Sequence, residues 1–134
     1  MPSNQPGQGR VLLLEDEPTI CRAALRTLTN QGYDVDIAIN GLIAKEKVDT
    51  SAPYDFCVFD IKTPIMNGIQ LYEYIEQEYP DLANRVIFTT GDSLGSITKF
   101  FLERVNRPCL SKPYTPAQLV SFIREVFSVS VVKP

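Results

Sequence analysis

The chain has 134 residues, which suits one domain and is too short for two of ordinary size. Its 44% apolar residues are enough to bury a core, and its net charge of −3 argues against a surface dedicated to nucleic acid or to an anionic membrane. The sequence contains no histidine, which excludes a Ser-His-Asp triad, an imidazole base and histidine ligands to zinc within this chain.

Three cysteines, Cys21, Cys57 and Cys109, are far apart in the sequence and form no C-x-x-C pair. Such a set is typical of reduced thiols that pack as small apolar side chains. The longest aliphatic run is too short to span a membrane, and residues 1–9 lack the apolar segment of a signal peptide. We therefore expect a cytoplasmic protein that makes no membrane contact.

Short apolar runs predict strands along the chain, after a flexible polar tail at residues 1–9. Most of these runs are uniformly apolar, as in strands buried on both faces, whereas the second alternates with polar residues as an edge strand does. The predicted strands cover residues 11–14, 34–39, 56–59, 85–89 and the region of 109–110.

Amphipathic stretches between these runs predict helices. Pro18 opens the first helix, whose inward stripe is Cys21, Ala24, Leu25 and Leu28. Asn40 is expected to cap the second helix, which reaches about Val48. The third carries Leu71 and Ile75 inward, and the fourth carries Leu94, Ile97 and Phe101. The last helix begins with a capping-box pattern, and its inward residues are Leu119, Phe122, Ile123 and Val126.

Five strands alternating with five helices predict an α/β fold over residues 10–127, followed by an unassigned tail at 128–134. The expected architecture is a flavodoxin-like (βα)5 domain. Its five-stranded parallel sheet has the strand order 2-1-3-4-5, and right-handed crossovers place helices on both faces.

Polar side chains follow four of the predicted strands. Glu15 and Asp16 follow the first, Asp60 the third, Thr90 the fourth and Lys112 the fifth. The carboxyl ends of parallel strands share one edge of a sheet, so these groups are expected to converge. Three close carboxylates repel unless a cation lies among them, and all-oxygen ligands favour Mg²⁺ or Mn²⁺. A lysine and a threonine opposite the metal suit a phosphoryl group, which the central carboxylate can accept as an acyl phosphate.

Four motifs carry a family resemblance: VLLLEDEP, VFDIKTPIMNG, FTTGD and LSKPY. In this order and at these separations they resemble the receiver domain of two-component response regulators, over residues 10–127. The stretches IFTTGDSLG and RPCLSKPYTPAQL are similar to the C-terminal receivers of hybrid histidine kinases, and a stand-alone regulator fits as well.

The resemblance implies roles for the acidic residues. Asp60 corresponds to the phosphoacceptor and Asp16 to the direct metal ligand. Glu15 corresponds to the other acidic residue of the pocket, where the family more often has aspartate. Lys62 would supply its backbone carbonyl to the metal. The implied cofactor is Mg²⁺ or Mn²⁺.

The resemblance also implies roles around the phosphoryl group. Thr90 corresponds to the switch hydroxyl, and Lys112 to the phosphate-pairing lysine, expected before a cis Lys112–Pro113 bond. Cys109 stands where many receivers carry an aromatic ring that turns inward on activation, so it is a candidate output-switch position. Lys62 and Asp92 are candidate modulators of dephosphorylation.

The resemblance implies a signalling domain and not a multiple-turnover enzyme. Its expected partner is a histidine kinase or a histidine phosphotransfer protein. A homodimer through the face of the fourth helix, fifth strand and fifth helix is a further expectation, with no nucleic-acid partner.

Two alternatives stay open. The first is a docking domain of the same fold that works without phosphorylation. The second is a small hydrolase, because Gly91-Asp92-Ser93-Leu94-Gly95 matches G-x-S-x-G between a strand and a helix. The missing histidine base argues against this reading, and a cap of the next helix is the simpler role for Asp92 or Ser93.

Overall fold

Five parallel strands form one sheet in the chain's computed structural model, which describes residues 9–51, 53–91 and 95–127. The strand order is β2-β1-β3-β4-β5, as the sequence predicts. Crossing helices link the strands, because parallel neighbours cannot be joined by a tight turn. The strands are β1 (Gly9–Leu14), β2 (Tyr33–Ala38), β3 (Phe56–Asp60), β4 (Val86–Thr90) and β5 (Cys109–Ser111).

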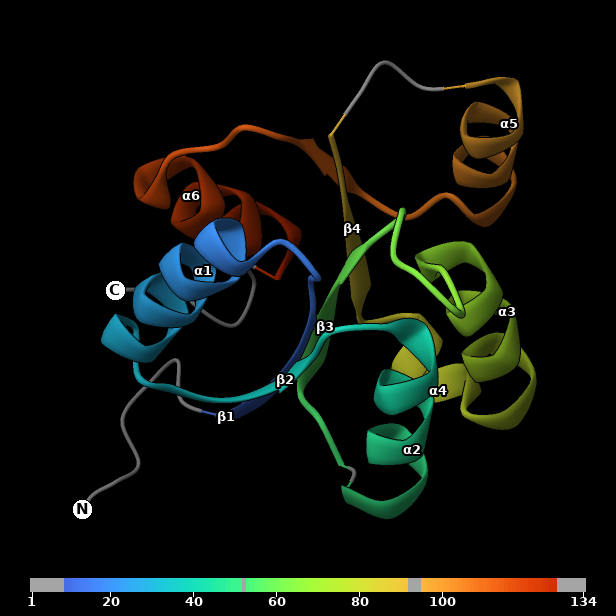
Figure 1. Cartoon of the computed structure of the whole chain (residues 1–134), viewed down its shortest axis with the longest axis horizontal. Helices are drawn as coiled ribbons and strands as arrows, with labels where there is room; N and C mark the ends of the chain where they lie inside the picture. The colour runs from blue at the N-terminus through green and yellow to red at the C-terminus, as the bar shows by residue number, and fades with distance from the viewer. Residues whose placement is uncertain (1–8, 52, 92–94, 128–134) are drawn as a thin grey trace.

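Helices cover both faces of the sheet (Figure 1). On one face lie two helices, α1 (Pro18–Asn30) and α6 (Pro116–Val126). The other face is covered by α2 (Gly41–Ser51), α3 (Gly68–Glu78), α4 (Pro80–Ala83) and α5 (Ser96–Val105). The sheet therefore buries a separate apolar core on each side, as doubly wound α/β folds do.

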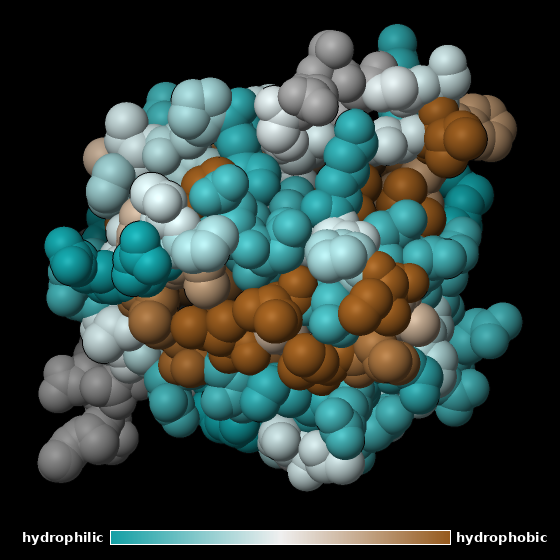
Figure 2. Space-filling view, viewed as in Figure 1, coloured by the Kyte–Doolittle hydropathy of each residue, from teal (hydrophilic) through white to brown (hydrophobic). Residues whose placement is uncertain are grey.

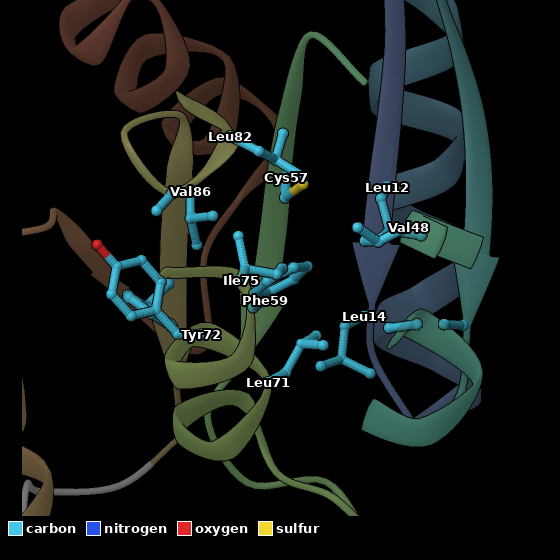
Figure 3. Packing of buried hydrophobic residues seen from close by; sticks show 14 of the residues in the cluster. Leu12, Leu14, Val48, Cys57, Phe59, Leu71, Tyr72, Ile75, Leu82 and Val86 are labelled. Carbon is cyan, nitrogen blue, oxygen red and sulfur yellow. The ribbon is translucent and has the colours of Figure 1, made fainter. Parts of the chain in front are cut away.

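The larger core lies between the sheet and α2 to α5. Ile75 of α3 lies against Phe59 of β3, and Leu71 points toward Leu14 of β1, as Figure 3 shows. Next to them, Tyr72 contacts both Phe88 of β4 and Phe101 of α5 edge-on, with ring centroids 5.5 and 5.7 Å apart. These contacts hold α3 and α5 against the strand that ends in Thr90.

The second core lies under α1 and α6 and contains the predicted stripe residues Cys21, Ala24, Leu28, Leu119 and Ile123. Leu25 is only partly buried. The remaining two predicted residues of α6, Phe122 and Val126, pack at the margin of this core.

Two helices begin with the capping residues that the sequence predicts. The Thr115 hydroxyl accepts a hydrogen bond from the Gln118 backbone, and the Gln118 side chain accepts one from the Thr115 backbone, so the predicted capping box is confirmed. Asn40 caps α2 by accepting a hydrogen bond from the Ile43 N–H at 2.8 Å. The predicted cis Lys112–Pro113 bond is also present.

Two expectations about helices are wrong. The structure contains a sixth helix, α4, whose single turn begins at Pro80 and buries Leu82 and Ala83. Ile97 is 79% exposed, whereas Phe101 is buried as predicted. Ile97 lies in the first turn of α5, where it lines an open groove between α3 and α5, so the apolar period extends one turn beyond the core. Leu94 lies outside the described residues.

The strands carry smaller differences at their ends. β1 begins at Gly9, two residues before the predicted start, and β2 covers 33–38 in place of 34–39. Ile39 therefore lies beyond the strand and is 56% exposed. Within the described ranges, no helix combines the length and the apolar character needed to cross a membrane.

Candidate functional site

Backbone hydrogen bonds continue past the ends of the strands and position the predicted polar groups. The Glu15 N–H donates to the Ala38 carbonyl at 3.0 Å, which ties the residue after β1 to the end of β2. The Lys112 N–H donates to the Thr90 carbonyl at 2.7 Å, which ties the residue after β5 to the end of β4. Asp60 itself ends β3. The ends of β1, β3, β4 and β5 therefore lie along one edge of the sheet.

Three carboxylates meet at this edge. One oxygen from each of Glu15, Asp16 and Asp60 lies within 4.8 Å of the others. Glu15 and Asp60 are almost fully buried, at 2% and 3% exposure, whereas Asp16 is exposed. The donors are all oxygens, so the group suits a hard divalent cation, and the structure brings together the three acidic residues that the sequence singles out.

Lys112 bridges the two buried carboxylates. Its Nζ lies 3.0 Å from Glu15 Oε1 and 3.1 Å from Asp60 Oδ2, and its side chain is 11% exposed. Glu15 also accepts a hydrogen bond from the Glu17 N–H at 3.1 Å, at the start of α1. Three carboxylates against one ammonium leave a negative pocket, and this imbalance is what a divalent cation would offset.

Burial dominates the electrostatics of the pocket. It raises the pKa of Asp60, although the Lys112 charge and its hydrogen bond oppose that rise. Burial and the nearby Asp60 charge raise the pKa of Glu15 in the same way. Burial lowers the pKa of Lys112, but its contacts with Glu15 and Asp60 outweigh this effect and raise the pKa overall. Lys112 therefore stays an ammonium at neutral pH.

Gly68 allows a close approach of α3 to the residue that ends β3. A Cβ at Gly68, the first residue of α3, would lie 2.6 Å from the Asp60 carbonyl oxygen and 3.0 Å from Ile61 Cα. A Cβ at Gly91 would be 3.8 Å from Lys112 Cε, which is an ordinary van der Waals contact. Sequence reasoning left Gly68 without a role; the signal was a glycine at a helix start directly after the cap Asn67.

The remaining predicted residues lie around this pocket. Thr90 is 6% exposed at the end of β4. Lys62 is exposed, and its backbone N–H donates to the Asp60 carboxylate. Cys109 lies half-buried on β5, where burial and the Asp60 charge raise its pKa to about 11. Asp92 and Ser93 lie outside the described residues.

Tyr114 is a neighbour of the pocket that sequence reasoning missed. Burial raises the pKa of its phenol, and the charges of Glu15 and Asp60 add to this rise. The signal was its place in the LSKPY motif, two residues after Lys112. All three cysteines are free thiols, and Cys21 and Cys57 are buried as predicted.

Known proteins are similar to this chain in sequence. The profile of the response regulator receiver domain matches residues 11–124. The chain is 33% identical over 119 residues to a probable transcriptional regulator, ycf29, of Porphyra purpurea, covering 87% of this chain and 55% of that protein. The response regulator receiver protein CpdR of Brucella abortus is 30% identical over 117 residues, covering 87% of this chain and 95% of CpdR.

Solved structures agree with the sequence comparison. The structure of a CheY-like response regulator receiver domain protein from Methanospirillum hungatei superposes with a TM-score of 0.79 at 25% identity, covering 90% of this chain and 94% of that one. The chain spans about half the length of the two ycf29 regulators it matches, from Porphyra purpurea and Pyropia yezoensis. The profile, the identity to CpdR and the strand order agree, so the chain belongs to the response regulator receiver domain family, whose members are signalling domains.

Proposed function

We propose that Asp60 accepts a phosphoryl group from a phosphohistidine of a partner protein, a histidine kinase or a histidine phosphotransfer protein. The observation that carries this proposal is the position of Lys112, which lies 3.1 Å from Asp60 and 3.0 Å from Glu15 at the edge of the sheet. A buried carboxylate beside a fixed ammonium is a nucleophile whose phosphorylated product has a counter-charge already in place.

The transfer is a single displacement at phosphorus. An oxygen of the Asp60 carboxylate bonds to the phosphorus while the phosphorus–nitrogen bond of the donor breaks. The electron pair of that bond stays on the imidazole, which takes up a proton from water. Lys112 then pairs with the oxygens of the new acyl phosphate, and the Thr90 hydroxyl, on the neighbouring strand, donates a hydrogen bond to one of them.

A divalent cation, Mg²⁺ or Mn²⁺, fits the carboxylate group. Glu15, Asp16 and Asp60 would hold it, together with the backbone carbonyl of Lys62. When bound, such an ion neutralises the negative charge of the carboxylates and of the incoming phosphoryl oxygens. Asp16 is the exposed member of the group, so it is the carboxylate best placed to exchange water for the ion.

The proposal extends to the output of the domain. The Thr90 carbonyl accepts the Lys112 N–H, so a change at either residue reaches β4 and β5 together. The face formed by α5, β5 and α6, with Cys109 on β5, is the surface we expect to change for a downstream partner or a second copy. Lys62 and Asp92 are the residues we expect to modulate hydrolysis of the acyl phosphate.

Small phosphodonors test the proposal without a partner. Incubation with acetyl phosphate or phosphoramidate in the presence of Mg²⁺ should add one phosphoryl group by intact-mass measurement. The addition should be lost in Asp60→Asn and when the metal is chelated. Equal labelling of Asp60→Asn would move the acceptor elsewhere, and no labelling of the wild-type chain would favour a docking domain that works without phosphorylation.

A further inference from the structure

One side of the sheet ends in an unpaired strand. The strand order places β2 at the margin of the sheet, and within the described ranges β2 pairs with β1 alone. Figure 1 shows β2 passing between α1 and α2, which contact it from the two faces of the sheet. We call the outer side of β2 (Tyr33–Ala38) the β2 edge. A strand at such a margin presents backbone groups to which a further strand can bond.

The hydrogen-bond pattern identifies the backbone groups that point to the β2 edge. In a parallel pair, every second residue directs both its N–H and its C=O toward the neighbouring strand. The Ala38 carbonyl accepts the Glu15 N–H, so Ala38 is directed toward β1. Counting back from Ala38 in steps of two gives the other residues that bond to β1. The N–H and C=O groups of Val35 and Ile37 therefore point away from β1, toward the open side.

The side chains of β2 form one apolar and one acidic face. Tyr33, Val35 and Ile37 pack at the margin of the core under α1 and α6, and all three are partly exposed. Figure 2 shows an apolar band that runs over β2 toward the start of α2. Asp34 and Asp36 lie on the opposite face, because successive side chains of a strand alternate. The β2 edge therefore suits a strand that is apolar on one face and polar on the other.

The acidic face carries more carboxylates than its nearest cation can neutralise. The Arg10 guanidinium lies 2.8 Å from Asp36 and 4.0 Å from Asp34, and the Arg10 backbone N–H donates to Asp55 at 2.7 Å. One guanidinium is thus shared among three carboxylates. The Asp34 side chain is 80% exposed, so it is accessible to a cation from another molecule.

The same charges disfavour a second copy of the chain at the β2 edge. Two β2 strands related by a two-fold axis pair in antiparallel orientation, and they share an apolar face only when both place their valine and isoleucine on the same side. Asp34 and Asp36 of one copy then lie opposite the same aspartates of the other, and like charges across a strand pair are destabilising. A strand with basic residues at these positions has the opposite effect.

We propose that the β2 edge binds an extended segment of a partner protein, in which aliphatic residues alternate with lysine or arginine, as a sixth strand of the sheet. Its aliphatic side chains lie beside Val35 and Ile37, and its basic side chains lie beside Asp34 and Asp36. Backbone hydrogen bonds to the β2 edge give the affinity, and the alternation of side chains gives the specificity. The surface runs along the side of the sheet, and the inference does not depend on phosphorylation of Asp60.

A synthetic strand tests the proposal. The probe is an acetylated and amidated octapeptide of alternating lysine and valine, titrated at low ionic strength into the full chain and followed by NMR. One control peptide has every backbone nitrogen methylated, so it keeps its charges and side chains but cannot donate backbone hydrogen bonds. A second control peptide has glutamate in place of lysine. Asp34→Asn is compared with Asp81→Asn, the same change at an exposed position of α4.

Hydrogen exchange should show the alternation of the backbone groups. At a free peptide concentration of about ten times the Kd, exchange of the Val35 and Ile37 N–H groups should slow by about tenfold, because exchange then occurs in the unbound fraction. The N–H groups of Asp34 and Asp36 should change little, because they already bond to β1. Asp34→Asn should weaken binding by about two- to fivefold, as the loss of one exposed ion pair predicts, and Asp81→Asn should match the wild type.

Several results overturn the inference. These are unchanged β2 resonances with the lysine–valine peptide, and equal binding of the methylated or the glutamate peptide. Protection of Val35 and Ile37 that rises with the concentration of the chain itself would assign the β2 edge to a second copy. No readout uses a phosphodonor, so labelling of Asp60 by phosphoramidate tests the proposed function separately, and either conclusion can fail without the other.

Discussion

Gly68→Ala tests how closely α3 approaches the strand that ends in Asp60. The added Cβ would lie 2.6 Å from the Asp60 carbonyl oxygen, which is backbone and cannot rotate away. Overpacking of this kind costs about 1–3 kcal/mol. The lower chain entropy of alanine in the unfolded state returns about 0.4–1 kcal/mol. We therefore expect the free energy of unfolding to fall by about 0.5–2 kcal/mol, with the melting temperature lowered by about 2–8 °C.

Gly95→Ala is the matched control, because a Cβ at this position meets no heavy atom within 4 Å. Gly95→Ala should change the free energy of unfolding by no more than about 0.5 kcal/mol. Alanine is a weaker helix cap, which lowers stability, but it also reduces the entropy of the unfolded chain, which raises stability. Urea unfolding followed by circular dichroism measures both variants. The displaced Asp60 carbonyl should also slow labelling by phosphoramidate in Gly68→Ala alone. Equal unfolding midpoints for Gly68→Ala and the wild type would refute the close-contact argument.

Further outcomes concern metal, phosphate, tyrosine and thiols. Asp16→Ala should weaken Mg²⁺ binding, measured by NMR titration, because a direct anionic ligand is removed. Lys112→Ala should fold, yet show smaller shift changes at Thr90 with a phosphoryl mimic, because the counter-charge is missing. The hydrogen bond to Asp49 raises the pKa of Tyr79 to about 12. This hydrogen bond should therefore stabilise the fold fully below pH 10, and the stabilisation should be lost as the pH rises through about 12. NMR of the Tyr79 ring measures the titration. A thiol reagent should modify native Cys109 slowly.

The convergence of the polar residues was predictable because it depends on where the strands end. Each apolar run stops at a polar residue, and a parallel sheet brings the carboxyl ends of its strands to one side. Chain order and crossover handedness then determine which ends are neighbours, so Glu15, Asp16 and Asp60 could be grouped without coordinates. The same holds for Lys112, whose contact with Asp60 joins residues 52 positions apart.

Features that depend on contacts between layers were not predictable. Ile97 has the spacing of a core residue, but its burial depends on whether another element covers the first turn of α5. The role of Gly68 appears only when the path of the loop back to Asp60 is known. The positive φ of Ile65 contradicts the backbone preference of isoleucine, and local propensity is a poor guide where a loop is fixed from both ends.

Lys112 connects the charges of the pocket to the backbone of the sheet. Lys112 satisfies Glu15 and Asp60 at once, while its backbone bonds to Thr90. In the proposed phosphorylated state the oxygens of the acyl phosphate carry more negative charge than the carboxylate they replace, so Lys112 turns from Glu15 toward them. Glu15 would keep the hydrogen bond from the Glu17 N–H, and the backbone hydrogen bond between Lys112 and Thr90 would pass the shift to β4 and β5. A lysine with a single carboxylate partner would have no second contact to give up, so the proposed response depends on Lys112 being shared between Glu15 and Asp60.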